Sequence, residues 1–129
     1  MLGRLATLID TYDWRKRYQA YSAGEAATSR ADLGLYTTKK VQYRYRQQGT
    51  GTPIVFLADP PITLEAYDAL FDVLSPHYTV IVIEAAGMGF SAANTRYGFG
   101  FQETHDDLAQ CLEAVAGPGA ILAFSCAAG

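Results

Sequence analysis

The chain has 129 residues, of which 50% are hydrophobic and 18% charged, and its formal net charge is −3. These values fit one globular domain of ordinary size and exclude a disordered chain or a fibre. The sequence has no run of 18 apolar residues and no continuous apolar stretch near its start, so neither a transmembrane helix nor a secretory signal is predicted. Two cysteines cannot form a disulfide framework and suit the reducing cytoplasm, where we expect the protein to be located.

Charge is distributed unevenly along the chain. Residues 1–48 hold nine of the ten basic residues and four of the thirteen acidic ones, whereas residues 49–129 hold Arg96 and nine acidic residues. A basic segment can meet an anionic surface such as nucleic acid or a membrane. Because aromatic residues interleave with the basic ones as they do in a strand, we instead expect the basic segment to pack beside the acidic remainder or to be a solvated face. We therefore expect neither nucleic acid nor a membrane as a partner.

The first part of the chain predicts an amphipathic helix, because apolar residues recur there at helical spacing. These residues are Leu2, Leu5, Leu8, Ile9 and Tyr12. Residues 22–32 are small and polar and indicate a linker. From residue 41 to residue 46, Val and Tyr alternate with Gln and Arg, a period of two that predicts a half-buried strand. We expect the face that carries Arg44 and Arg46 to be exposed, since charge protects the edge of a sheet from mispairing.

Three short apolar runs follow, at residues 54–57, 80–83 and 121–124, and two helical patterns separate them. Apolar runs of this length indicate strands that are buried on both faces. The first helical pattern has one apolar face, formed by Leu64, Tyr67, Leu70, Phe71 and Leu74, with Thr63 as the N-cap. The second has Phe101, Leu108, Leu112 and Val115, with Thr104 in front of its first turn and Gly117 after its end.

The order strand, strand, helix, strand, helix, strand predicts an α/β fold. Such a fold has a mostly parallel sheet with helices on both faces, because each parallel pair of strands needs a crossover connection. Functional residues are expected at the carboxyl ends of the strands.

The last apolar run leads directly into a serine. The segment from Ala123 to Ala127 has the sequence A-F-S-C-A, a relaxed form of G-x-S-x-G. Small residues two positions before and after Ser125 let the chain make the sharp turn that lifts a nucleophile out of the sheet edge. Cys126 is a rival nucleophile, but Phe124, two residues before it, is too bulky for this turn. The alternative is a serine that caps the next helix.

Two further segments follow the other apolar runs, LADPPITLEAY after the first and EAAGMGFS after the second. Together with Ser125 they resemble the α/β-hydrolase family over roughly residues 36–129. At the first place that family has H-G-x-P and then an aromatic residue. Here Ala58 and Asp59 replace the His and Gly, whereas Pro61 and Tyr67 match.

The second segment matches the family's D-x-x-G-x-G-x-S from Glu84 to Ser91, with Glu in place of Asp. It is the most specific of the three matches. Its two glycines, Gly87 and Gly89, are expected to adopt backbone angles that side chains forbid.

The resemblance implies a serine hydrolase that cleaves a small ester-type acyl substrate, with Ser125 as the nucleophile. It also implies an oxyanion hole formed by the backbone N–H of Cys126 and a second donor in the loop that contains Asp59 and Pro60. Proline has no N–H, so either the loop shifts to present another donor, or the reaction needs less oxyanion stabilisation, or the site is inactive. Neither a cofactor nor a metal is expected.

The histidine and the acid of this family follow the serine in chain order, and no histidine follows Ser125 in this sequence. His77 precedes a strand, at the wrong end of the sheet. His105, Asp106 and Asp107 are adjacent and cannot all face one metal ion from a helix. The strand before Ser125 would also be an uncovered apolar edge. We therefore expect a remaining C-terminal half, as a continuation of the chain or as a second chain, to complete the fold and the site.

These predictions divide the chain into an N-terminal helical extension with its linker, residues 1–35, and the N-terminal half of an α/β-hydrolase core, residues 36–129. A small-molecule substrate is the expected partner. The alternative is a non-catalytic binding or receptor-like member of the fold, which Pro60 and the missing His-Gly pair favour. A thioesterase or acyltransferase that works with a carrier protein is a weaker alternative, favoured only by the uneven charge.

Overall fold

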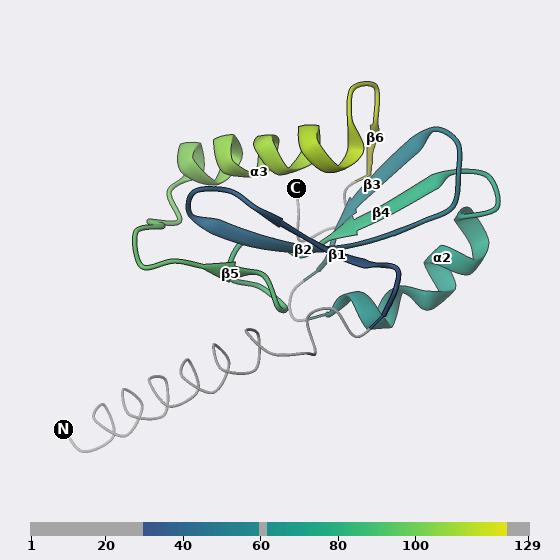
Figure 1. Ribbon diagram of the computed structural model, residues 1–129, viewed down its shortest axis with the longest axis horizontal. Helices are drawn as coiled ribbons and strands as arrows, with labels where there is room; N and C mark the ends of the chain where they lie inside the picture. The colour runs from purple at the N-terminus through teal and green to yellow at the C-terminus, as the bar shows by residue number, and fades with distance from the viewer. Residues whose placement is uncertain (1–29, 60–61, 124–129) are drawn as a thin grey trace, which may run out of the picture.

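One mixed β-sheet with helices on both faces makes up residues 30–59 and 62–123, the part of the chain that the computed structural model describes. Its strands are β1 (Leu33–Thr37), β2 (Val41–Gln48), β3 (Pro53–Leu57), β4 (Thr79–Ile83), β5 (Ala92–Ala93) and β6 (Ile121–Ala123). Its helices are the short 3-10 helix η2 (Leu64–Tyr67), which leads into α2 (Asp68–Leu74), and α3 (Phe101–Ala116). Figure 1 shows α3 on one side of the sheet and α2 on the other. The predicted α/β fold is confirmed.

The three apolar runs form the parallel part of the sheet, which has the spatial order β1-β2-β4-β3-β6. β3 pairs in parallel with both β4 and β6. The last four residues of β4 are fully buried, as expected for a central strand that is covered on both faces. Alternate side chains of β4 enter two core clusters, one that contains Phe71 of α2 and one that contains Cys111 of α3.

The antiparallel part of the sheet includes β1 and β5, which the sequence patterns did not predict. Both strands pair with β2, and β2 pairs with β4. In β1, Gly34 lies opposite Tyr45, and a Cβ atom at position 34 would be 2.4 Å from Tyr45 Cζ. The close contact with Tyr45 requires glycine at position 34. Because glycine is depleted in strands, this residue also makes β1 harder to predict from the sequence. β1 runs across residue 35, where we placed the end of the N-terminal extension, so residues 33–35 belong to the sheet.

The prediction of an exposed charged face on β2 is wrong. β2 lies between β1 and β4, and the side chains of Arg44 and Arg46 are 0% and 3% exposed. Arg46 forms ion pairs with Asp32 and Asp68, and its guanidinium carbon lies 4.0 Å from the centroid of the Phe71 ring. In the described part of the basic segment, Arg44 and Arg46 thus pair with carboxylates of the same chain, as in the first of the two arrangements expected for the segment.

Both predicted helices are present, although α3 starts earlier than predicted. The first helix buries an apolar face that includes Phe71. α3 begins at Phe101, with Gly100 rather than Thr104 before its first turn, and Phe101 is 88% exposed instead of packed. It ends as predicted just before Gly117, whose φ is +72°. Among the described residues, no helix combines the length and apolar character that crossing a membrane requires.

β6 forms one border of the described sheet. Ile121 and Leu122 are each 47% exposed, whereas their apolar run predicted burial on both faces. The difference arises because, within the described ranges, β6 pairs with β3 alone. The predicted N-terminal helix and the turn around Ser125 lie outside the described residues.

Candidate functional site

The carboxyl ends of β3, β4 and β6 meet at one edge of the sheet. The parallel registers place Leu57 opposite Ile83 and Phe56 opposite Ala123. The loop after β3, the loop after β4 and the chain after β6 therefore leave the sheet at the same edge. In open α/β sheets this edge is where ligands bind.

Only one of the four predicted site residues, Asp59, is among the described residues. Ser125, Cys126 and Pro60 lie outside them. Ala123, the last residue of β6, precedes Ser125 by two positions, so the strand delivers the chain to the edge at which we predicted the nucleophile.

A tyrosine anchors the start of the loop after β3. The N–H of Ala58 donates to the carbonyl of Ile83 at 2.8 Å and extends the ladder beyond β3. The next N–H, that of Asp59, donates to the hydroxyl of Tyr67 at 2.9 Å. Tyr67 matched the aromatic residue of the family pattern, and the structure gives this residue a role: its hydroxyl occupies the backbone donor of Asp59.

Glu84, directly after β4, is a fully buried carboxylate that joins the two loops. Its Oε1 accepts the N–H of Leu64 at 3.2 Å, and its Oε2 accepts the N–H of Phe90 at 2.6 Å. Arg44 Nη1 lies 3.2 Å from the same Oε1. Burial raises the pKa of the Glu84 carboxyl above its ordinary value, and the two N–H donors and the Arg44 charge limit the shift.

Arg44 also pairs with a second carboxylate, that of Glu65 in η2. Arg44 Nη1 lies 3.3 Å from Glu65 Oε2, and Nη2 bonds the other carboxylate oxygen. Burial alone would raise the pKa of Glu65, but hydrogen bonds from Arg44 and Thr63 outweigh it and lower the pKa to about 2. Arg44 is fully buried, so two carboxylates share one cation at this edge.

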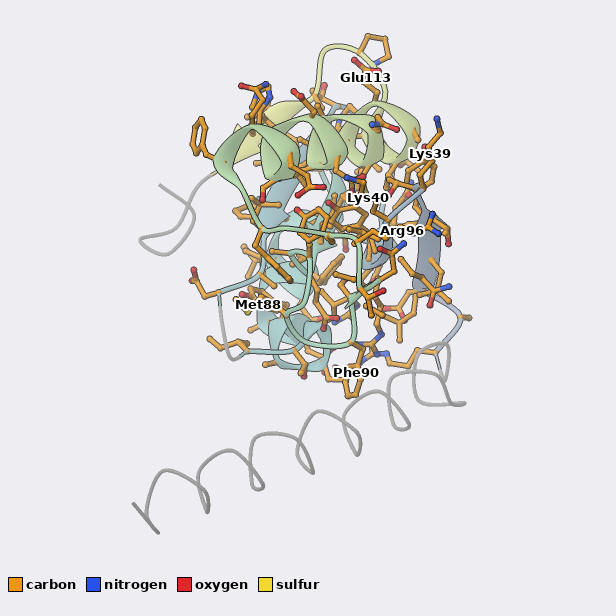
Figure 2. All side chains as sticks on the ribbon, turned by 90° about the vertical axis from the view of Figure 1, so that its left-hand side faces the viewer. Lys39, Lys40, Met88, Phe90, Arg96 and Glu113 are labelled. Atoms are coloured by element: carbon orange, nitrogen blue, oxygen red, sulfur yellow. The ribbon has the colours of Figure 1, made fainter. Side chains whose placement is uncertain are left out.

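The loop from Glu84 to Ser91 is closed by its own hydroxyl. Ser91 Oγ donates to the carbonyl of Glu84 at 2.8 Å and accepts the N–H of Arg44 at 2.8 Å, and the residue is fully buried. Gly89 has a φ of +51°, and a Cβ atom there would lie 2.2 Å from Glu84 Cδ. The second glycine of the pattern, Gly89, is therefore required by its contact with Glu84 as well as by its backbone angle. Figure 2 shows Met88 and Phe90 of this loop away from α3, whereas Lys40 lies close to that helix.

The described histidines lie apart from this network. His77 is exposed in the turn before β4, at the amino end of that strand. His105 is exposed on α3, and its Nδ1 lies 3.1 Å from Asp106 Oδ1. Asp107 points inward instead, where it accepts hydrogen bonds from the hydroxyl of Tyr43 at 2.9 Å and from Thr38. Over residues 30–59 and 62–123, no three His, Cys, Asp or Glu side chains are arranged to hold a metal ion.

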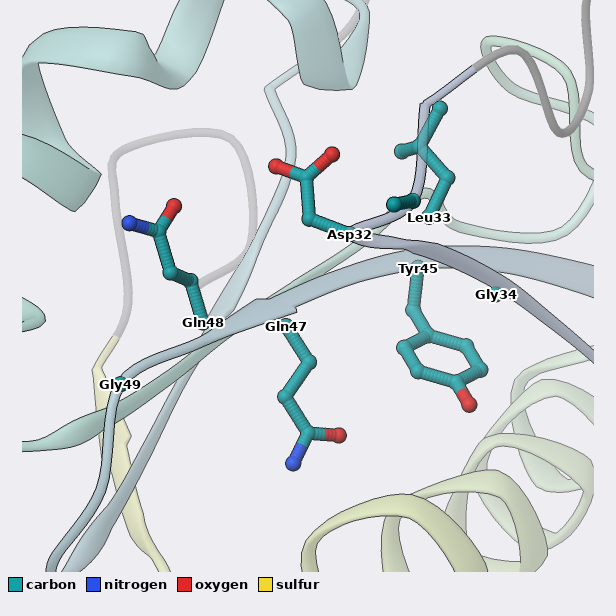
Figure 3. Close-up of a pocket in the computed structure, with 8 residues that line it drawn as sticks. Asp32, Leu33, Gly34, Tyr45, Gln47, Gln48 and Gly49 are labelled. Atoms are coloured by element: carbon teal, nitrogen blue, oxygen red, sulfur yellow. The ribbon is translucent and has the colours of Figure 1, made fainter.

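Two hollows are open on the described surface. A groove of about 250 Å³ runs between α3, β3 and β6 and is lined by apolar side chains that include Leu57, Leu108 and Leu122, with His105 also on its lining. A second hollow of about 390 Å³ is lined by the start of β1 and the end of β2. Figure 3 shows that Asp32 and Gln48 point to one side of these strands, whereas Tyr45 and Gln47 point to the other.

The groove, rather than the second hollow, adjoins the candidate site. The second hollow is lined by residues of β1, β2 and their flanking segments and by none of β3, β4 or β6, so it lies away from the loops that leave the carboxyl edge. The groove includes Ala123, the last described residue before Ser125.

The reasoning from sequence missed Arg44 and Glu65 as parts of this edge. The antiparallel pairing of β2 with β4 is what places Arg44 beside Glu84. In this pairing Tyr45 lies opposite Ile83, and the N–H of Glu84 donates to the carbonyl of Arg44 at 3.0 Å. This pairing could have been proposed from the two strand patterns. It would have placed a buried cation next to the carboxylate that ends β4.

Solved structures of hydrolases are similar to the fold of this chain. The Cif epoxide hydrolase from Acinetobacter nosocomialis is 22% identical and superposes with a TM-score of 0.59, over 72% of this chain and 31% of its own. The haloalkane dehalogenase DbeA from Bradyrhizobium elkani is 18% identical, with a TM-score of 0.63 over 72% of this chain and 32% of its own. An alpha/beta hydrolase from Sphaerobacter thermophilus is 25% identical, with a TM-score of 0.59 over 70% and 35%.

The chain therefore has the α/β-hydrolase fold over the part that corresponds to the start of that fold. It spans about a third of the length of these structures. The sequence matches no protein-family model, and a search of curated proteins found no match. The resemblance inferred from three short motifs is thus confirmed at the level of fold.

Proposed function

We propose that this chain is part of a hydrolase that cleaves a small ester-type acyl substrate by nucleophilic attack of Ser125. The observation that carries the proposal is the course of β6. This strand runs parallel to β3 and ends two residues before Ser125, at the edge where the loops of Asp59 and Glu84 also leave the sheet. The hydrolases that share the fold support a hydrolytic reaction.

In the proposed reaction, Ser125 Oγ attacks the acyl carbonyl carbon while a histidine takes the hydroxyl proton. The tetrahedral intermediate collapses, the alcohol leaves with that proton, and an acyl-serine ester remains. Water then attacks the ester, releases the acid and restores the serine. The backbone N–H of Cys126 stabilises the negative oxygen in both steps.

The second oxyanion donor is the weak point of this site. Pro60 has no N–H, and the N–H of Asp59 donates to Tyr67 at 2.9 Å. Loss of one donor lowers turnover by roughly 100- to 1,000-fold. We therefore propose that the reaction needs less oxyanion stabilisation than two donors give; a loop that shifts to present another donor and an inactive site are the alternatives.

We propose that the remaining C-terminal half, as a continuation or as a second chain, supplies the histidine and the acid. The matched part of this chain covers 31% and 32% of two of the solved hydrolases, which supports the idea. The half-exposed side chains of Ile121 and Leu122 and the apolar groove beside α3 are surfaces that such a half would cover.

The test is labelling of the native protein, together with any copurifying half, by a serine-directed fluorophosphonate. We expect one adduct, mapped to Ser125 by peptide mass spectrometry, and ester hydrolysis that is lost in Ser125→Ala. Cys126→Ala is the matched control: it removes the rival nucleophile but keeps the backbone N–H, so labelling should persist. Absence of an adduct on Ser125, together with unchanged activity of Ser125→Ala, would contradict the proposal.

A non-catalytic binding member of the fold is the second candidate, because Pro60 has no N–H and the N–H of Asp59 donates to Tyr67. It predicts saturable binding of a small molecule without turnover. Calorimetry on the native protein, followed by analysis of the recovered ligand, distinguishes the two functions. A hydrolysed ligand supports the enzyme, whereas an intact one supports the binding protein.

A thioesterase or acyltransferase that uses a carrier protein stays a weaker alternative, which we propose only from the uneven charge, and among the described residues part of this charge is paired within the chain. Four basic residues of the first part of the chain form internal ion pairs, namely Arg30, Lys40, Arg44 and Arg46. We retain a cytoplasmic location as a proposal from composition, to be checked by cell fractionation.

A further inference from the structure

One side chain, that of Glu84, bridges the two loops at the carboxyl edge. Its Oε1 accepts the N–H of Leu64, the first residue of η2, at 3.2 Å. Its Oε2 accepts the N–H of Phe90 at 2.6 Å, in the loop after β4. Since Glu84 itself directly follows β4, the central strand, the carboxylate fixes the start of η2 relative to the most buried part of the sheet.

Arg44 also connects η2 with the loop after β4. Its guanidinium contacts Glu84 and also Glu65, the second residue of η2. Its Cζ lies 4.7 Å from the centroid of the Phe90 ring. A fully buried cation in β2 therefore holds both the bridging carboxylate and the two segments that the carboxylate bridges.

The other end of η2 reaches the loop after β3. η2 is a single turn that ends at Tyr67, and the hydroxyl of Tyr67 accepts the N–H of Asp59 at 2.9 Å. A continuous set of contacts thus runs from Arg44 and Glu84 through η2 to Asp59. Any displacement of η2 moves the tyrosine that holds this loop.

Stability alone does not explain this network. Buried ion pairs are often no more stabilising than apolar side chains of the same size, and this face of the sheet already has an apolar cluster around Leu64, Phe71 and Val82. Apolar packing is not directional, whereas two hydrogen bonds to one carboxylate fix the positions of two backbone groups. The network therefore fixes positions of backbone groups that apolar packing alone would not fix.

We propose that Glu84, held in place by Arg44, is a positioning residue for the active site: it orients η2 and, through Tyr67, the loop at Asp59. The proposal rests on the proposed function, because the position of the loop at Asp59 matters for catalysis only if Ser125 is the nucleophile. Glu84 itself is fully buried and does not touch the substrate. Gly89 is matched to this role, since any side chain there would occupy the space of the carboxylate.

The test compares Glu84→Gln, Glu84→Asp and a matched control, Asp107→Asn, in the native protein with any copurifying half. Asp107 is also a buried carboxylate, 7% exposed, but it bonds Tyr43 and Thr38 near α3, away from η2. Two readouts are used: amide hydrogen exchange, which needs no activity, and kcat and KM for ester hydrolysis. Thermal unfolding of each variant reports whether it is folded.

For Glu84→Gln, which loses the charge and one acceptor oxygen, we expect amide exchange from Asp59 to Tyr67 to accelerate by about tenfold or more, with β3 and β4 unchanged. We expect kcat to fall by about 100-fold while KM stays within about twofold, because the loop is misplaced rather than the substrate site removed. Glu84→Asp keeps both acceptor oxygens and should recover most of the kcat. Asp107→Asn should change neither readout.

Unchanged exchange in η2 of Glu84→Gln, or an equal loss of kcat in Asp107→Asn, would overturn the proposal. If the wild-type protein shows neither turnover nor a Ser125 adduct, the proposed function fails. Hydrogen exchange then decides the positioning role alone. Release of η2 and Asp59 in Glu84→Gln but not in Asp107→Asn would support it, and equal exchange in both would refute it.

Discussion

Replacement of Gly89 by alanine places a methyl group against the buried carboxylate of Glu84. The new Cβ atom would lie 2.2 Å from Glu84 Cδ and 2.5 and 2.6 Å from its two oxygens. Carbon atoms in contact are normally about 3.5–4.0 Å apart, so the carboxylate must move by about 1 Å or more. That movement takes it away from the N–H groups of Leu64 and Phe90.

The expected cost has two parts. Gly89 has a φ of +51°, a left-handed conformation that costs an alanine about 1–2 kcal/mol. One backbone N–H that loses its buried partner adds about 1–3 kcal/mol. We therefore expect Gly89→Ala to lower the free energy of unfolding by about 2–5 kcal/mol.

Gly119→Ala separates the two parts. Gly119 has a φ of +79°, but a Cβ atom there would meet nothing within 4 Å, so this variant should show only the backbone cost of about 1–2 kcal/mol. Urea unfolding of both variants in the native protein measures the difference. If Gly89→Ala costs no more than Gly119→Ala, the inferred contact with Glu84 is wrong. As a further check, Gly89→Ala should cost less in a Glu84→Ala background, which a double-mutant cycle would detect.

Three further predictions concern single groups. Tyr67→Phe removes the acceptor of the Asp59 N–H and should destabilise the protein by about 1 kcal/mol and accelerate exchange at Asp59; unchanged exchange there would contradict the anchoring role. Glu65 has its pKa lowered to about 2, so its contribution to stability is present above its ordinary pKa of 4.5 and is lost as the pH falls toward 2. Urea unfolding from pH 5 to pH 2 should show that the free energy of unfolding falls less in Glu65→Gln than in the wild type. The difference should be modest because the side chain of Glu65 is 40% exposed, and parallel curves of the free energy against pH would refute the prediction. Burial raises the pKa of the Cys111 thiol to about 12, so a maleimide at pH 8 should leave Cys111 unmodified until denaturant is added, and peptide mapping that finds rapid modification of the folded protein would refute this.

The parallel half of the fold was predictable because burial on both faces leaves a simple mark in the sequence. The runs at 54–57 and 80–83 consist of apolar residues that can face either side of the sheet, and they became β3 and β4. β1 carries no such mark. It is five residues long, lies on the border of the described sheet and contains Gly34, which the ring of Tyr45 requires.

The alternating pattern of β2 was recognised, but its charged face was assigned to solvent. A charged side chain needs polar partners, but the sequence pattern alone does not show whether these partners are water molecules or carboxylates. Arg44 and Arg46 obtain their partners from residues 21 to 40 positions further along the chain and from Asp32. Local pattern cannot reveal such pairs until strand pairing is known, so the candidate site was predicted through its motifs while its buried cation was missed.

The two faces of the sheet control the carboxyl edge by different physical means. On the α2 face, Arg44 and Glu84 fix the start of η2 through directed charge-assisted hydrogen bonds. On the α3 face, the surface next to β6 is an apolar groove that includes Leu122, and apolar contact has no preferred direction. Contacts within the described residues thus orient the start of the loop at Asp59, whereas the apolar groove can accept a covering segment without a fixed hydrogen-bond pattern. Substitutions in the groove should therefore alter the association with the proposed C-terminal half, and substitutions at Glu84 should alter the geometry of the site that this half completes.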